Sequence, residues 1–202
     1  PLLLNGNKFH LRVFVLVVGS VEVYVSPDFL AIFSLETYSA TNLANTRAHL
    51  TNIAIQEILS QDDQHRCMRL FDETVSDMVE CGIVSHADQA REKIEKVKSR
   101  VYCMVKETIE AVSSELTFQT RSNCFELFGF DFIISPDWQV WLLEANSQPD
   151  LAKAGERLQP IIDRIITDTV TLTTDCNPRF PGSESEADIK LVKVYSRKAD
   201  SR

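Results

Sequence analysis

A strongly apolar stretch near the start of the chain, Lys8–Val18, limits the fold more than any other segment. It is rich in Val, Leu and Phe, and the Gly19-Ser20 pair directly after it is a hairpin turn signal. Val21–Val25 then alternates apolar with polar residues, and Phe29–Leu35 follows a second turn signal at Pro27-Asp28. We therefore predict a β-meander over the first forty residues, with a sheet at the centre of the fold.

Two later segments show the three- and four-residue spacing of amphipathic helices. The first runs from Asp88 to about Leu116, and the second spans Arg157–Leu172. Their apolar stripes consist of Ile94, Val97, Val101, Met104, Val105, Thr108, Ile109 and Val112 in the first and of Leu158, Ile161, Ile162, Ile165, Ile166 and Val170 in the second. Together with the strands they predict an α+β fold, a largely antiparallel sheet flanked by two long helices.

Basic residues of the first helix lie mostly off its apolar stripe. They are Arg91, Lys93, Lys96, Lys98 and Arg100, with Glu92 and Glu95 between them. This interleaving favours an ordinary solvated helix face. The alternative is a local basic patch that binds an acidic partner.

The segments between the strands and helices carry weaker signals. Residues 41–52 are polar and lie between apolar segments, which makes them a candidate site. Ile53–Leu59 is predicted to begin a helix, whereas residues 60–88 are charged and weakly patterned.

The C-terminal part of the chain differs in composition. Residues 175–188 are rich in Pro, Gly, Ser and Glu, which predicts a linker. Ile189–Tyr195 is compatible with one late strand, and we expect disorder in the last seven residues. We therefore divide the chain into a main domain, 1–174, and a region of linker, late strand and tail, 175–202.

Composition and charge narrow the function classes. The chain has 44% apolar and 25% charged residues, as folded globular proteins do and disordered ones do not. Its longest apolar run near the start, Val13–Val18, is far shorter than a membrane span requires. A formal net charge of −8 argues against a nucleic-acid binder, because neutralising phosphates needs clustered Lys and Arg. The five cysteines include no CxxC pair, which predicts buried reduced thiols in a cytosolic protein rather than a zinc site or a disulfide framework.

Two predicted strands, Cys124–Ile134 and Gln139–Asn146, form a hairpin around a Ser-Pro-Asp turn. If Pro136–Gln139 is the loop, Ser135 lies opposite Val140 in the ladder. Continued along the strands, this register places two acidic residues directly opposite each other.

These acids are Asp131 and Glu144, and Asn146 shares the face of Glu144 because side chains alternate along a strand. Opposed like charges are destabilising, so we expect a positive group to offset them. Two carboxylates and an amide oxygen suit Mg²⁺. The alternative is a solvent-exposed hairpin whose acids point into water.

Lys8, His10 and Arg12 share one face of the first strand, and the apolar residues between them take the other. Lys and Arg on one sheet face can clamp phosphate oxygens. The alternative is an exposed strand start with ordinary charges. Because two cations flank His10, its protonation is disfavoured, and we assign it no metal.

A third segment is His49-Leu50-Thr51-Asn52. Taken alone, His49 is more often a hydrogen-bonded loop histidine than a catalytic one. The chain contains no nucleophile elbow GxSxG, no Walker A loop and no GxGxxG. If the protein uses ATP, it binds ATP without these loops.

Together these segments resemble the tubulin–tyrosine ligase-like family, an ATP-grasp group. The matching stretches are PLLLNGNKFHLRVFVLV at 1–17, NLANTRAHLTN at 42–52 and FELFGFDFIISPDWQVWLLEANSQPDL at 125–151. The resemblance covers about Pro1 to Thr173 and implies the C-terminal subdomain of an ATP-grasp fold. The family's adenine-binding hinge precedes the segment that matches Pro1–Leu4. We therefore expect the C-terminal part of a longer catalytic domain, inactive by itself.

The resemblance also implies roles for individual residues. Asp131, Glu144 and Asn146 match the Mg²⁺ ligands. Lys8 and Arg12 match the family's basic pair near the ATP phosphates and the acyl-phosphate, and are the implied catalytic residues. The implied ATP-binding residues are Lys8, His49, Leu50, Thr51, Asn52, Asp131 and Glu144.

Two positions depart from the family pattern. The first-strand motif usually reads Lys-Phe-Asp-x-Arg, whereas the third place here is His10. A further arginine usually lies on the third strand, where our alignment places Ile32. Both changes touch the substrate side of the site and bear on which amino acid and which acceptor are used.

The activity that the resemblance implies is ATP-dependent ligation of a free amino acid to a protein carboxylate. ATP phosphorylates the carboxylate, and the amine then attacks the acyl-phosphate, a reaction that depends mainly on positioning and charge stabilisation. Tubulin is the implied acceptor, in the cytoplasm and in association with microtubules, with no nucleic-acid or membrane partner.

Two alternatives remain open. One is a non-catalytic or truncated module of the same family. The other is a ligase with a non-tubulin acceptor, because Asn146–Asp150 resembles a fungal branch in which this domain follows a SurE-like phosphatase domain.

Overall fold

The computed structural model describes residues 1–56, 58, 60–113, 115, 121, 124–147, 149, 151, 155–175 and 189–197. Its strands form one eight-stranded sheet in which every pairing is antiparallel. They are β1 Leu3–Leu4, β2 Asn7–Val18, β3 Glu22–Val25, β4 Leu30–Thr37, β5 Met68–Leu70, β6 Phe125–Ile134, β7 Val140–Asn146 and β8 Val192–Ser196.

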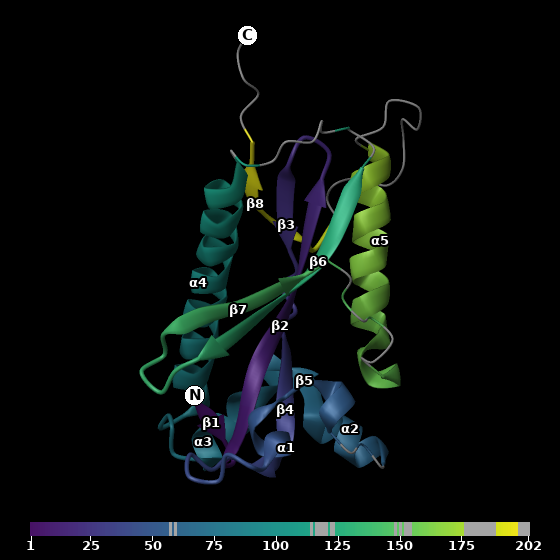
Figure 1. Ribbon diagram of the computed structural model, residues 1–202. Coiled ribbons are helices and arrows are strands. Elements are labelled where there is room, and N and C mark those ends of the chain that lie inside the picture. Colours follow the sequence, from purple (N-terminus) through teal and green to yellow (C-terminus); the bar gives the residue numbers. More distant parts are fainter. Residues whose placement is uncertain are drawn as a thin grey trace.

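The helices are α1 Thr46–His49, α2 Gln61–Cys67, α3 Val75–Glu80, α4 Ala87–Ser113 and α5 Gln159–Asp175. Short 3-10 turns lie at Ile53–Ile55, Phe71–Thr74 and Glu156–Leu158. The two long helices, α4 and α5, stand on either side of the sheet (Figure 1). The predicted α+β fold, an antiparallel sheet flanked by two long helices, is confirmed.

The long strand β2 is the axis of the sheet. Leu11 and Arg12 pair with both β4 and β6, whereas Val15–Val18 pairs with both β3 and β6. β3 and β4 therefore follow one another along the same edge of β2, and β6 takes the other edge. The predicted meander is wrong, because β4 pairs with β2 rather than with β3. Pro27-Asp28 does not reverse the chain; it interrupts a strand, since proline has no N–H to give to the ladder.

The turn between β2 and β3 also differs from the prediction. Val18 pairs with Glu22, so the turn contains Val21 as well as Gly19-Ser20. Val21 has φ of 73°, a conformation that costs a β-branched residue about 1–3 kcal/mol. Its side chain is nevertheless buried in the main core, which offsets the strain.

The two faces of β2 pack against different helices. One face packs against α4 in the largest apolar core, and its side chains are Phe9, Leu11, Val13 and Val15. Phe14 packs with the start of α5, and Leu16 and Val18 pack with its end. The predicted helical stripes are confirmed near the sheet, but Val112 on α4 and Ile166 and Val170 on α5 are exposed.

The basic residues of α4 contact groups of their own chain. Exposed ion pairs include Arg91–Asp88, Lys96–Glu92 and Arg100–Glu107, and Lys93 lies over the ring of Trp138. These contacts favour the solvated helix face over a basic patch. Lys98 differs from the prediction, because it is buried and its Nζ donates to Asp72 at 2.6 Å.

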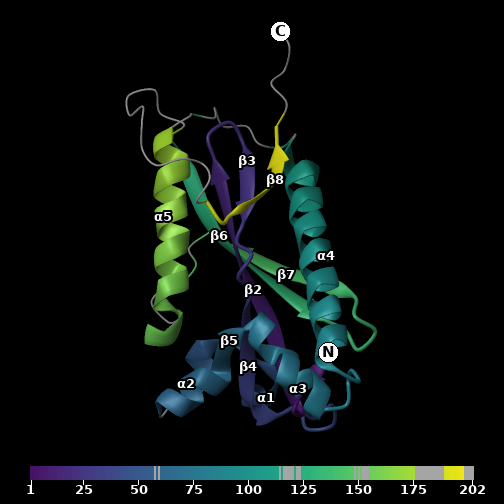
Figure 2. The same ribbon diagram turned by 180° about the vertical axis from the view of Figure 1, so that it is seen from behind.

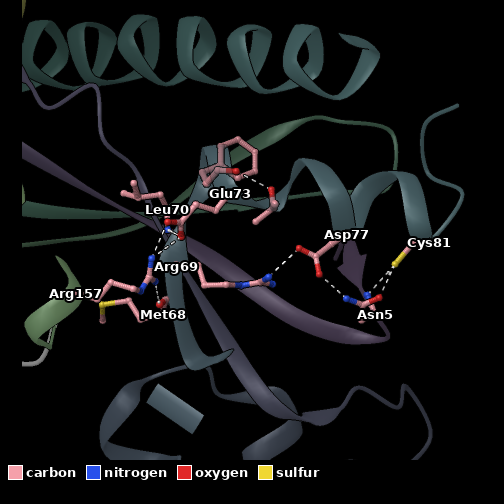
Figure 3. Close-up of polar contacts among 10 residues, drawn as sticks. Asn5, Met68, Arg69, Leu70, Glu73, Asp77, Cys81 and Arg157 are labelled. Carbon is pink, nitrogen blue, oxygen red and sulfur yellow. Dashed lines mark hydrogen bonds and ion pairs between the residues drawn. The ribbon is translucent and has the colours of Figure 1, made fainter. Parts of the chain in front are cut away.

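Residues 60–88, weakly patterned in the sequence, fold into α2, β5 and α3, which Figure 2 shows together at the β4 end of the sheet. Polar contacts hold this region together (Figure 3). Arg69 Nη1 donates to Asp77 Oδ2 at 2.8 Å, and Asn5 Nδ2 donates to Asp77 Oδ1 at 2.6 Å. Arg157, in the 3-10 turn directly before α5, donates to both carboxylate oxygens of Glu73 and to the carbonyl of Met68.

The C-terminal predictions are tested only in part. β8 pairs with β3, which confirms the late strand. Residues 176–188 of the predicted linker and residues 198–202 of the predicted tail lie outside the described residues. The division into 1–174 and 175–202 stays a prediction. None of the described helices has both the length and the apolar character that crossing a membrane requires.

The prediction of buried cysteines is mostly wrong. Cys67 is buried, whereas Cys81, Cys103 and Cys124 are exposed. All four are free thiols, and Cys176 lies outside the described residues.

The Asp77 contacts yield a stability prediction. Asp77→Ala would leave the Arg69 guanidinium, whose side chain is 24% exposed, without its ion pair. We expect a loss of about 2–3 kcal/mol in the free energy of unfolding, measured by urea denaturation. Glu107→Ala removes the exposed pair with Arg100 and should change it by less than about 0.5 kcal/mol. Equal losses in the two variants would contradict a special role for Asp77.

Candidate functional site

The hairpin of β6 and β7 brings two acidic residues together by a route that the sequence did not indicate. Next to the loop, Ile134 pairs with Val140, one residue away from the predicted pairing of Ser135 with Val140. A register shift between Phe132 and Asp131 then adds one residue to β7.

The shift restores the predicted pairing of Asp131 with Glu144. It amounts to a β-bulge, since Leu142 and Glu144 pair with successive residues of β6 and Leu143 has no counterpart. The predicted opposition of the two acids is therefore confirmed, although the predicted loop register is wrong.

Arg12 is the positive group that the opposed acids require. It is the direct partner of Asp131 across β2 and β6. Its Nε donates to Asp131 Oδ1 and its Nη2 donates to Asp131 Oδ2, a bidentate contact. Asp131 is only 5% exposed, so this contact neutralises a buried charge.

Gly129 makes room for this contact, and sequence reasoning missed it. A Cβ built on Gly129 would lie 2.9 Å from Arg12 Cδ and 3.1 Å from Pro149 Cβ. Any larger residue would therefore displace the arginine side chain. The only sequence signal was a glycine inside a strand, a pattern typical of a close approach by another group.

Glu144 and Asn146 form the exposed part of the site. Asn146 Nδ2 donates to Glu144 Oε1 at 2.9 Å, so the two share a face as predicted. Asp131 instead contacts Arg12. Among the described residues, no group of three or more His, Cys, Asp and Glu side chains is close enough to hold a metal ion.

The donor chemistry still fits Mg²⁺. Asp131, Glu144 and Asn146 offer hard oxygen donors on neighbouring strands, and Mg²⁺ commonly takes one or two carboxylates with phosphate and water oxygens. Both oxygens of Asp131 accept from Arg12, so a metal bound there would either share the carboxylate with the arginine or replace one of its contacts.

The segment His49–Asn52 borders the basic face of β2. Lys8 Nζ donates to the His49 carbonyl at 2.7 Å, and partial burial lowers the pKa of Lys8. The His49 ring nitrogen Nε2 lies 3.0 Å from the Asn42 carbonyl, and the ring meets Tyr38 edge-on. These contacts are those of a hydrogen-bonded loop histidine. Leu50 and Asn52 are exposed, whereas Thr51 is buried.

His10 is the most buried polar residue of the basic face. Its Nδ1 lies 2.6 Å from Thr51 Oγ1. The pKa of His10 is lowered to about 3, chiefly by burial and then by the neighbouring Arg12 and Lys8, against an opposing effect of Glu144. The imidazole is therefore neutral at physiological pH, as its position between two cations predicted.

The two departures from the family pattern face each other. His10 on β2 pairs directly with Ile32 on β4, and both side chains are buried. They are cross-strand neighbours, which the sequence alone did not reveal. The pair puts a neutral ring against an aliphatic side chain next to Arg12.

Gln56 shapes the loop that carries Thr51, and sequence reasoning missed it too. Its Oε1 accepts from the Leu35 amide at 3.0 Å, and its Nε2 donates to the carbonyls of Arg47 and Leu50. It is buried, although it lies in a segment where the sequence predicted the start of a helix. The described residues of that segment contain a 3-10 turn at Ile53–Ile55, and Glu57 and Leu59 lie outside the described residues.

The chain is similar to known proteins over most of its length. It matches the tubulin-tyrosine ligase family over residues 1–183. A probable tubulin–tyrosine ligase, PBY1 of Saccharomyces cerevisiae, is 30% identical over 96% of this chain and 26% of its own length. Tubulin glycylase 3D of Tetrahymena thermophila is 27% identical over 96% of this chain and 19% of its own length.

Among solved structures, the C-terminal domain of Pby1 from K. lactis has a similar fold. The TM-score is 0.70 at 25% identity, over 98% of this chain and 51% of that one. It is described as an ATP-grasp enzyme that interacts with the mRNA decapping enzyme Dcp2. The chain thus spans about half of this structure and about a quarter or less of the two curated relatives.

The neutral state of His10 yields a prediction on pH. The pKa of His10 is about 3 in the folded protein and about 6.5 in the unfolded chain, so the unfolded chain binds more protons between these values. Stability from this residue is therefore present above about pH 6.5 and falls as the pH drops. We expect wild type to lose about 2 kcal/mol more than His10→Asn between pH 7.5 and pH 5, in urea unfolding. A difference between the two proteins that does not change with pH would contradict this assignment.

Proposed function

The chain belongs to the tubulin-tyrosine ligase family, and we propose that it forms the phosphate-binding part of an ATP-dependent ligase that joins an amino acid to a protein carboxylate. The observation that carries the proposal is the bidentate contact of Arg12 with Asp131, directly beside Glu144. It places a cation that can bind phosphate next to carboxylates that can bind a metal.

The proposed reaction has two steps. The acceptor carboxylate attacks the γ-phosphorus of ATP, the bond to ADP breaks, and an acyl-phosphate forms. The amine of the free amino acid then attacks the acyl carbon, phosphate leaves, and the nitrogen loses a proton. Both steps develop negative charge on phosphate oxygens, so they depend on cations held in fixed positions.

Residues of this chain have distinct roles in the proposal. Arg12 presents a planar fork that can grip phosphate or acyl-phosphate oxygens, and Lys8 adds a second cation on the same strand face. Asp131, Glu144 and Asn146 would hold Mg²⁺, which when bound draws charge away from the phosphates. Thr51 and the main chain of His49 fix the side chains of His10 and Lys8 beside this site.

Tubulin is the acceptor that we propose first. Relatives of this chain carry the names tubulin–tyrosine ligase, tubulin glycylase and tubulin polyglutamylase. The amino acid is therefore sought among tyrosine, glycine and glutamate.

A second acceptor class is favoured by one specific observation. The K. lactis Pby1 domain, similar over 98% of this chain, is described by its interaction with Dcp2. The same ligation chemistry on a protein of mRNA decapping is therefore the second candidate. His10 and Ile32, the two positions that differ from the family pattern, pair with each other beside Arg12. This difference also favours an acceptor other than tubulin.

The deciding experiment is an incorporation assay with the whole protein. Labelled tyrosine, glycine or glutamate is supplied with Mg-ATP and with either tubulin or purified Dcp2, and transfer of the label is measured. Label on tubulin supports the first candidate, and label on Dcp2 alone supports the second. Mg-ATP binding without transfer to either would favour a non-catalytic module.

Glu144→Gln tests the proposed metal ligands. It removes one carboxylate and relieves the opposition of two like charges across the hairpin, so the fold should be at least as stable as wild type. Ligation should fall below about 1% of wild type in the incorporation assay, with thermal unfolding measured alongside. Glu92→Gln, on the exposed face of α4, is the matched control and should keep full activity. Normal turnover by Glu144→Gln would remove Glu144 from the proposed site.

Arg12→Lys tests whether charge alone suffices. Lysine keeps the positive charge but cannot make two parallel N–H contacts, so activity should drop about tenfold or more. Arg91→Lys makes the same exchange in an exposed ion pair and should leave the rate unchanged. The measurement is the rate of amino-acid incorporation. Wild-type activity in Arg12→Lys would show that the bidentate geometry has no role in the reaction.

A further inference from the structure

His10 holds a hydrogen-bonding atom that the proposed reaction leaves unused. The residue is 5% exposed, and its Nδ1 already lies against Thr51 Oγ1. Its Nε2 is buried and has no hydrogen-bond partner among the described residues. Folded proteins rarely leave such an atom unpaired, because its lost contacts with water are then not replaced.

The surroundings of His10 favour one tautomer. Nε2 lies 3.8 Å from Asp131 Oδ1. The negative charge of Asp131 attracts a proton on Nε2 and would repel a lone pair there. The Thr51 hydroxyl can donate to Nδ1, since a hydroxyl serves as either donor or acceptor. The neutral ring therefore carries its proton on Nε2, directed toward Asp131.

The N–H of His10 does not reach Asp131, its nearest acceptor. Arg12 holds both oxygens of Asp131, and 3.8 Å is too long for a hydrogen bond from His10 in this arrangement. A shift of about 1 Å would bring the two atoms within range. Ile32, the direct partner of His10 on β4, offers no competing acceptor from its side chain.

From these contacts we propose that His10 is a positioning residue that takes over Asp131 when Arg12 moves to a phosphate. The inference rests on the proposed function, which needs Arg12 at the phosphates and Asp131 at the metal. When the arginine leaves, the Asp131 oxygen that does not bind the metal loses its hydrogen-bond donor in a buried site. The His10 N–H stabilises the carboxylate in place and so lowers the cost of releasing Arg12.

The first test uses the whole protein without nucleotide. Nitrogen-15 NMR of the imidazole should show the neutral Nε2–H tautomer, with the His10 signals identified by their loss in His10→Gln. In Arg12→Ala, Asp131 is released, and the Nε2 proton should shift downfield as its hydrogen bond to Asp131 forms. A proton on Nδ1 in wild type, or an unchanged Nε2 signal in a folded Arg12→Ala, would overturn the proposal.

The second test does not depend on a variant that folds. Wild type is titrated with Mg²⁺ and the non-hydrolysable analogue AMP-PNP, and the same downfield shift is expected as the site fills. Binding without the shift would overturn the role of His10 and leave the proposed function standing. No binding by the whole protein would overturn the proposed function, and this inference with it.

Affinity gives a readout that packing alone would not change. His10→Ala should weaken calorimetric binding of Mg-AMP-PNP to the whole protein about tenfold, as expected for one lost hydrogen bond to a charged group. Ile162→Val removes one methyl group from the apolar cluster that also contains Ile32, without touching a polar contact, and should bind as wild type does. Equal affinities for His10→Ala and Ile162→Val would show that His10 only fills space.

Discussion

The contact between Arg12 and Asp131 is the interaction on which the site depends. It joins β2 to β6 across the middle of the sheet, between residues 119 positions apart in the chain. Because Asp131 is buried, losing the arginine would leave an uncompensated charge and cost about 3–5 kcal/mol. A metal at Asp131 would share the carboxylate with this arginine or replace one of the arginine contacts. The guanidinium of Arg12 thus occupies the side of Asp131 at which the proposed reaction places Mg²⁺.

The position of the site follows from the two faces of β2. One face is apolar from Phe9 to Val15 and packs against α4. On the other face, Phe14, Leu16 and Val18 pack against α5. The polar residues Lys8, His10 and Arg12 precede them on this second face. The site therefore lies on the same face of β2 that packs against α5, at the part of the strand that α5 does not cover. The loop that carries Thr51 borders it.

Local sequence patterns were sufficient for the elements and for the residue types at the site. The apolar run of β2, the two long helices and the late strand follow from periodicity and spacing within single segments. The opposition of Asp131 to Glu144 was also predicted, but a β-bulge in β7 was needed to offset the wrong loop register. The pattern failed where polar contacts between distant segments decide the structure. Residues 60–88 are the clearest case. They lack a regular spacing of apolar residues, and ion pairs such as Arg69 with Asp77 stabilise their fold.

The sequence by itself determined which chemical groups are present and which face of each strand carries them, because side-chain alternation is a property of the local backbone. Only the tertiary structure decided which groups meet. It set β4 beside β2, so that His10 faces Ile32, and it brought Arg12 onto Asp131 past Gly129. These outcomes depend on pairing between strands remote in the chain and on the room left by a missing side chain, and neither is encoded in any short segment.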